Sequence, residues 1–235
     1  SLLFVYWENQ LSNKSILVTG GAGYLGSILS RELSFAARQF EKVYIVDKGL
    51  YGFNGLDQFE NFLQQDIKEV DISQFENVEW IIHLADINPS GCFDHLSDAD
   101  YLRVKENIKV ITQIAKKNQS KVILISDYRT LSFKMNGEVG DKHSELKRYE
   151  EEYLKSEGVE FYTIYFGEFY GPSPRMRFDR NYNRIIADIL SGTTIRVSEY
   201  GREWVCLTNV KNASDFIVRF ISGTYKNNLQ DQFFI

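Results

Sequence analysis

The segment Gly-Gly-Ala-Gly-Tyr-Leu-Gly at residues 20–26 constrains the fold of this chain more than any other feature. It follows the short apolar run of residues 16–18, which is typical of a buried parallel strand. It leads into residues 24–38, where apolar side chains recur at helical spacing. A strand that passes through a glycine-rich turn directly into a helix is the first unit of a nucleotide-binding α/β domain.

Each glycine of this turn has a mechanical task in such a domain. Gly20 allows the tight turn out of the strand, Gly23 lets the backbone approach a pyrophosphate, and Gly26 permits close packing of the helix on the sheet. The N–H groups at the helix start, those of Tyr24 and Leu25, then favour the phosphate charge. A purely structural turn is the alternative interpretation.

A carboxylate stands where a bound dinucleotide needs one. Residues 43–46 form the next expected strand, and Asp47 lies at its tip. Its distance in sequence from Gly26 is close to that of a carboxylate that binds a ribose hydroxyl, which favours nucleotide binding over a structural turn. Because a carboxylate repels a 2′-phosphate, we expect NAD rather than NADP as the cofactor.

Strand and helix patterns alternate along the rest of the chain. The remaining strands are expected at residues 62–63, 80–84, 121–125, 161–166 and 232–235, and the remaining helices at 98–117, 142–156, 185–190 and 213–221. This alternation predicts an α/β fold, a doubly wound parallel sheet of the Rossmann type.

The proline-containing segment of residues 170–175 holds two of the three prolines and marks the expected domain boundary. We therefore expect an N-terminal arm (1–14), an NAD-binding Rossmann domain (15–171), and a small, reduced substrate lobe (172–235) that includes a returning helix and a last strand.

Composition excludes several classes of function. The net charge is −5 and no long basic run occurs, which argues against a nucleic-acid partner. The apolar residues 2–7 are too few to span a membrane and lack the features of a signal peptide, so we expect a cytoplasmic protein. Cys92 and Cys206 form neither a disulfide framework nor a zinc site, and we expect two free thiols and no metal.

The glycine turn resembles the opening of the NAD-dependent epimerase/dehydratase family, the extended short-chain dehydrogenases that act on nucleotide sugars. Later segments resemble family motifs in the same order: Gln65-Asp66-Ile67, the His-Leu-Ala-Asp of residues 83–86, Ile125-Ser126, Tyr170-Gly171-Pro172, and the segment of residues 202–210.

The resemblance implies roles for several residues. Asp66 and Ile67 are expected to contact adenine, and Leu84 and Ala85 to lie under the cofactor. The implied substrate is a nucleotide sugar, and the implied reaction is transient or net hydride transfer at a sugar carbon, by an epimerase, dehydratase or reductase.

The reactive residues depart from the family pattern. The family uses a tyrosine and a lysine four positions later on one helix face, and here those places hold His143 and Lys147. Ser126 matches the strand end leading to the site. The place of the assisting Ser or Thr falls on Tyr128, or on Asp127 if the alignment shifts by one residue.

Two interpretations of this departure stay open. In the first, His143 is the base, with its pKa lowered by Lys147, or Tyr128 reaches in from the strand end. In the second, His143 is a solvated helix residue and the protein is a catalytically silent dinucleotide-binding sensor or assembly partner. Glu168 is a further departure, because the family often has Asn there, and a carboxylate opposes a substrate diphosphate.

The resemblance also implies a homodimer. Residues 98–117 and 142–156 occupy the places where relatives pair as four helices. Leu102, Ile108, Ile111 and Ala115 supply an apolar stripe for this contact, although the same stripe suits packing on the sheet. Relatives usually continue beyond the last strand, so we expect either a compact member or a pocket completed by another chain.

Overall fold

A computed structural model describes residues 14–35, 40–53, 55–86, 96–138, 140–195, 204–223 and 232–234. Most of the expected N-terminal arm, Cys92, Arg202 and the end of the first expected helix lie outside these ranges.

The main sheet has seven parallel strands in the order β3-β2-β1-β4-β5-β6-β9. Its strands are β1 (Ser15–Thr19), β2 (Val43–Asp47), β3 (Phe62–Gln64), β4 (Val78–His83), β5 (Lys121–Asp127), β6 (Phe161–Phe166) and β9 (Gln232–Phe234). Their short apolar runs suit a sheet that helices cover on both faces. A second, two-stranded parallel sheet pairs β7 (Glu168–Tyr170) with β8 (Leu207–Asn209).

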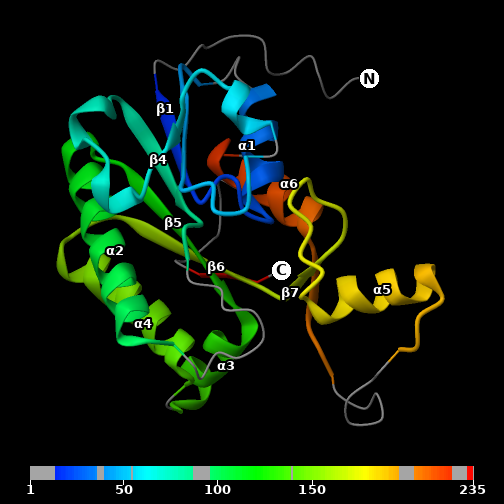
Figure 1. The fold of residues 1–235 in the computed structure, drawn as a ribbon. Coiled ribbons are helices and arrows are strands. Elements are labelled where there is room, and N and C mark those ends of the chain that lie inside the picture. The colour runs from blue at the N-terminus through cyan, green and yellow to red at the C-terminus, as the bar shows by residue number, and fades with distance from the viewer. Residues whose placement is uncertain are drawn as a thin grey trace.

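Helices cover the main sheet on its two faces (Figure 1). On one face, α1 (Gly26–Phe35) and α6 (Val210–Ile221) share an apolar core with the sheet. On the other, α2 (Asp98–Asn118) and α4 (Lys142–Ser156) do so. The expected doubly wound Rossmann fold is therefore confirmed.

The remaining helices are shorter. They are α3 (Tyr128–Asn136), α5 (Asn181–Ser191) and the 3₁₀ turns η2 (Leu56–Gln58), η3 (Ile67–Glu69) and η4 (Ile72–Gln74). In Figure 1, α5 projects away from the two helical layers. None of the helices in the described ranges is long and apolar enough to cross a membrane.

The expected elements are present, with local differences; α5 and α6, for example, begin at residues 181 and 210 rather than at 185 and 213. The first helix begins at Gly26 rather than at residue 24, because residues 20–25 form the turn itself. The sequence did not indicate α3, which begins because the Asp127 carboxylate accepts the amides of Arg129 and Thr130. It also did not indicate the short β7–β8 sheet.

The apolar stripe on α2 faces the sheet. Ile108 and Ile111 are fully buried and Ala115 nearly so, all within the core between α2, α4 and the sheet. Only Leu102 of the four is exposed. The idea that this stripe forms a dimer contact is wrong for the three buried residues.

Of the elements that follow Gly171, some pack on the main sheet and others do not. β8 pairs with β7 and α5 stands apart, whereas α6 returns to pack on α1 and β9 adds to the edge of the main sheet. Cys206, the cysteine within the described ranges, is an exposed free thiol.

Candidate functional site

The strand order reverses direction between β1 and β4. From β1 the chain builds outward to β2 and β3 on one side, and then to β4, β5 and β6 on the other. The carboxyl ends of β1 and β4 therefore border the crevice in which doubly wound sheets bind ligands.

The glycine turn lies directly against the end of β4. Gly20 has a positive φ of 71°, and a Cβ there would lie 2.6 Å from backbone atoms of Leu84 and Ala85. A Cβ on Gly26 would collide with the Gly20 carbonyl. Only glycine satisfies both positions, because one needs left-handed backbone and both lack space for a side chain.

The helix start next to this turn offers unused hydrogen-bond donors. Gly23 donates to the Gly20 carbonyl at 3.1 Å, and Ala22 donates to the Asp47 carboxylate at 2.9 Å. The amides of Tyr24 and Leu25 have no hydrogen-bond partner in the part of the chain that the structure describes. Such amides at a helix N-terminus suit a phosphate group.

Asp47 is held rigidly at the tip of β2. Its Oδ2 accepts the Ala22 amide at 2.9 Å, and its Oδ1 accepts the Gly49 amide at 2.8 Å. Each carboxylate oxygen can accept a second hydrogen bond. The carboxylate is thus oriented by the turn and can still receive two ribose hydroxyls.

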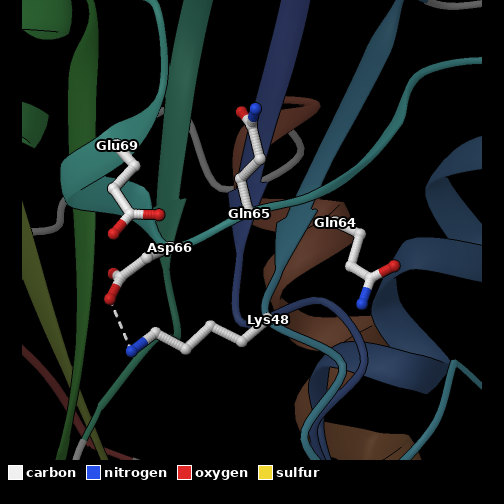
Figure 2. A pocket seen from close by; sticks show the side chains of 5 residues that line it. All are labelled: Lys48, Gln64, Gln65, Asp66 and Glu69. Carbon is white, nitrogen blue, oxygen red and sulfur yellow. Dashed lines mark ion pairs between the residues drawn. The ribbon is translucent and has the colours of Figure 1, made fainter.

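A polar hollow of about 320 Å³ opens beyond the ends of β2 and β3 (Figure 2). It is lined by Lys48, Gln64, Gln65, Asp66 and Glu69. Lys48 Nζ forms an ion pair with Asp66 Oδ2 at 2.5 Å, so the two side chains meet across the hollow. It lies beyond Asp47, on the adenosine side of a Rossmann crevice.

The expected adenine residues differ in exposure to this hollow. Asp66 lines it and caps η3 by accepting the Lys68 amide at 3.4 Å. Ile67 is 3% exposed, and its side chain packs in the core. Of the pair, Asp66 is therefore the one whose side chain faces the hollow.

A charged cluster lies on the other side of the crevice, and we call it the Asp86 cluster: Asp86, His143, Lys147 and Glu150. Asp86 follows β4, and its Oδ2 contacts His143 Nε2 at 3.1 Å and Lys147 Nζ at 2.9 Å. His143 and Lys147 are one turn apart on α4, and both are buried. Glu150 Oε2 accepts Lys147 Nζ at 3.1 Å.

The Asp86 cluster keeps its charges despite burial. Burial works against the Lys147 ammonium, but Asp86 and Glu150 outweigh it and raise the pKa of Lys147 above its usual value. Burial likewise raises the pKa of Asp86, but the charges of Lys147 and His143 prevail and hold that pKa well below its usual range. Lys147 and Asp86 are therefore an ion pair across the neutral pH range.

A buried polar chain joins this cluster to the glycine turn. Glu150 Oε1 lies 3.6 Å from His83 Nε2, and His83 Nδ1 lies 2.7 Å from Thr19 Oγ1. The Ala85 amide also donates to Thr19 Oγ1, at 3.4 Å.

The sequence comparison finds that part of the chain is similar to a known family. Residues 16–127 match the family model described as "NAD dependent epimerase/dehydratase family". Over these residues, a little under half of the chain, the sequence is similar to this family. No curated protein matches the sequence.

Solved structures share the fold at low sequence identity. A UDP-N-acetylglucosamine 4-epimerase from Methanobrevibacter ruminantium M1 has a TM-score of 0.77 and 18% identity, with 95% of this chain and 76% of that chain covered. An ADP-L-glycero-D-manno-heptose-6-epimerase from Helicobacter pylori has a TM-score of 0.78 and 17% identity, with 98% and 79% covered.

A third solved structure is a mutant UDP-glucuronic acid 4-epimerase from Bacillus cereus in complex with UDP-4-deoxy-4-fluoro-glucuronic acid and NAD. It has a TM-score of 0.75 and 22% identity, with 94% of this chain and 77% of that chain covered. At these identities, the likenesses establish a common Rossmann fold.

His143 stands where the resemblance to the epimerase/dehydratase family places a tyrosine, and it is 6% exposed. The alternative of a solvated histidine is therefore wrong. Burial favours its neutral form, but the Asp86 charge and hydrogen bond outweigh both burial and the Lys147 charge, so the pKa of His143 lies above 6.5. The expectation that Lys147 sets a lowered pKa is wrong, because it did not include Asp86.

The strand end before α3 brings a carboxylate, not a hydroxyl, to His143. Asp127 Oδ2 lies 3.6 Å from His143 Nδ1. Within the described ranges, the buried Ser126 hydroxyl has no hydrogen-bond partner, and no hydrogen bond or ion pair joins Tyr128 to the Asp86 cluster. Burial raises the pKa of Tyr128, which keeps its phenol protonated. Of the two alignments, Asp127 is thus the residue near His143.

The Glu168 carboxylate acts electrostatically on Arg180. Arg180, which caps α5, lies close enough to Glu168 for the carboxylate to act on its pKa, although burial and the Arg177 charge act more strongly and lower that pKa.

The sequence did not identify Asp86, Glu150, His83 or Thr19 as site residues. The sequence could have indicated Asp86 as a site residue, because it replaces the last alanine of the family's His-Leu-Ala-Ala segment. Glu150 carried none, since an acidic residue in a helix rich in Glu and Lys is ordinary. No set of three His, Cys, Asp or Glu side chains able to hold a metal occurs among the described residues.

Proposed function

We propose that the protein binds NAD along the crevice and catalyses transient or net hydride transfer at a carbon of a nucleotide sugar. The observation that carries this proposal is the contact of Asp86 with both His143 and Lys147, at 3.1 and 2.9 Å. An acid–base group and a buried cation thus meet beyond β4, across the switch point from the Asp47 carboxylate.

The residues of the crevice fit the parts of NAD in order. Asp47 and the polar hollow hold the adenosine half, and the amides of Tyr24 and Leu25 receive the pyrophosphate. Lys147 uses two of its three N–H donors on Asp86 and Glu150, and donates the third to the second ribose.

A bound nicotinamide supplies hydride exchange with the sugar carbon, and the protein handles the proton. Asp86 orients His143 through Nε2 and stabilises its protonated form. With Nε2 held by Asp86, His143 would exchange a proton with the sugar hydroxyl through Nδ1, which is buried in this structure and lies 3.6 Å from Asp127 Oδ2. Lys147 keeps Asp86 ionised, so that the carboxylate does not take the proton itself.

Two measurements test this function. Mass spectrometry of the dialysed and then denatured protein should detect retained NAD. If none is retained, calorimetry should show that added NAD binds to the folded protein. A panel of nucleotide sugars should then produce NADH absorbance or an isomerised or dehydrated product. At a pH above the pKa of His143, His143→Gln should abolish turnover and leave NAD affinity within about threefold, since it removes the proton exchange only. Turnover that is unchanged in this variant would overturn the role of His143.

A second candidate is a catalytically silent NAD-binding protein that acts as a sensor or assembly partner. The observation in its favour is that Lys147 is already bound by two carboxylates, Asp86 and Glu150. A silent protein would bind NAD, turn over no sugar of the panel, and show no measurable change with His143→Gln.

A further inference from the structure

The net charge of the Asp86 cluster depends on whether His143 carries a proton. Asp86 and Glu150 are negative and Lys147 is positive. With a proton on His143 the four groups sum to zero, and without it they carry one net negative charge. Because all but Asp86 are buried, and Asp86 is mostly covered, water screens this change weakly.

Other charged and titratable groups face the Asp86 cluster from β5, β4 and α2. Asp127, which faces His143 from β5, is paired with Arg129 of α3 at 3.3 Å. His83, on β4, lies on the far side of Glu150, with its Nε2 3.6 Å from Glu150 Oε1 and its Nδ1 2.7 Å from Thr19 Oγ1. On the α2 side, the Tyr101 hydroxyl contacts the carboxylate of Glu145 at 3.3 Å, near the solvent-exposed start of α4.

We infer that Asp86 is a positioning residue that couples the proton on His143 to the oxidation state of the bound nucleotide. The site releases this proton to solvent when the oxidised, cationic nicotinamide ring binds, and keeps it when the reduced, neutral ring binds. The inference rests on the proposed function, because it requires the nicotinamide half of the cofactor to lie beside β4 and β5.

The physical reason is that two positive charges compete for one negative site. Asp86 stabilises the His143 imidazolium, and a cationic ring in the same half of the crevice repels that imidazolium while being attracted by the same carboxylates. By linkage, a ligand that favours the deprotonated form binds more tightly as the pH rises. A neutral ring has no such preference.

This coupling would give each step of a redox reaction the proton form that it needs. Oxidation of a sugar hydroxyl requires a base, and His143 is unprotonated when the oxidised cofactor is bound. Reduction of the resulting ketone requires an acid, and His143 is protonated when the reduced cofactor is bound. Binding itself moves one proton to the buffer and no electrons.

Titration calorimetry of the full chain in buffers of different ionisation enthalpy measures the protons released on binding. Between about pH 6 and 9, NAD⁺ should release up to one proton, and its affinity should rise by up to about tenfold per pH unit where release is complete. NADH should release close to none. Asp86→Asn should remove the NAD⁺-linked release near neutral pH, since His143 is then neutral before the ligand arrives.

Two further variants keep the test decisive. His143→Gln should also abolish the release, and it serves if Asp86→Asn does not fold. Asp66→Asn makes the same chemical change in the adenosine half, so it should alter the affinities for NAD⁺ and NADH equally and leave the proton release intact.

Equal proton release with NAD⁺ and NADH would overturn the inference while leaving NAD binding in place. So would a release that persists in Asp86→Asn and His143→Gln. If neither nucleotide binds, the proposed function fails and this inference fails with it.

Discussion

The hydroxyl of Tyr24 donates a 2.5 Å hydrogen bond to the carbonyl of Gly171, so the glycine turn is fastened to the segment that follows β7. Asn183 of α5 donates to the same hydroxyl at 2.9 Å, and the Ser173 hydroxyl donates to the Tyr24 carbonyl at 2.7 Å. A movement of the α5 region would therefore also move Tyr24, which lies at the proposed pyrophosphate site.

Tyr24→Phe should destabilise the protein by about 1–3 kcal/mol, because it leaves the Gly171 carbonyl without its partner and removes one of the two hydrogen bonds that the Asn183 amide nitrogen donates. Urea unfolding monitored by fluorescence measures this loss. Tyr162→Phe is the matched control, since it removes an exposed hydroxyl bonded to Glu160 and should cost no more than about 0.5 kcal/mol. Equal effects of the two substitutions would contradict a fastening role for Tyr24.

The Asp47 carboxylate should make the protein prefer NAD to NADP by at least about tenfold, or about 1.4 kcal/mol. Its orientation by Ala22 and Gly49 directs it at the ribose that carries the 2′-phosphate of NADP. Asp47→Asn keeps an acceptor but removes the charge, so it should reduce this preference. Calorimetry with both nucleotides decides the matter, and equal affinities in the unmodified protein would refute the assignment.

Lys147→Met should destabilise the protein by about 3–5 kcal/mol at neutral pH, because it leaves Asp86 and Glu150 buried without a cation. Lys116→Met, at a half-exposed pair with Glu157, is the matched control and should cost at most about 1 kcal/mol. Unfolding midpoints of both variants in urea provide the comparison.

The cost of Lys147→Met should shrink as the pH falls. Burial raises the pKa of Glu150, but Lys147 and His83 outweigh it, so the folded-state pKa lies below 4.5. The pKa of Asp86 is lowered as well. Their stabilisation is thus complete above the unfolded-state values and is lost as the pH falls through the folded-state ones. A difference between variant and unmodified protein that stays constant from pH 7 to 3 would contradict the ion-pair account.

Oxidation of a nucleotide sugar should accelerate as the pH rises through the pKa of His143 in the NAD⁺ complex, because the base must be unprotonated. Tyr128→Phe should leave this profile unchanged, since burial raises the pKa of Tyr128 further above 10. Initial rates between about pH 6 and 9 test both statements. A pH rise that disappears in Tyr128→Phe and survives in His143→Gln would assign the base to Tyr128.

We further propose a homodimer, formed through the outer surfaces of α2 and α4. Since Ile108, Ile111 and Ala115 face the sheet, Leu102 is the member of the α2 stripe that is left for such a contact, with 58% of its surface exposed. Light scattering should give twice the chain mass, and Leu102→Glu should return it to 27.3 kDa. A 27.3 kDa particle for the unmodified protein at micromolar concentration would exclude the dimer.

Much of the fold could be read from the sequence because its signals are local. The run of residues 16–18, the glycines that follow, and Asp47 at the next strand tip each depend on neighbours within a few positions, and the structure places them as expected. The limits of α4 and β6 were predicted to the residue, since periodicity and strand propensity act along the chain. The sequence did not predict α3, because the start of this helix depends on a single capping carboxylate, that of Asp127.

The chemistry of the site was decided by tertiary structure. Asp86 and His143 are 57 positions apart, and they meet only because β4, β5 and α4 pack in one register. The direction of the His143 pKa shift is a sum of burial, one attractive carboxylate and one repulsive ammonium, and the sequence revealed only the ammonium on the same helix. Charges interact through space and burial is a property of the whole fold, so neither can be read from spacing along the chain.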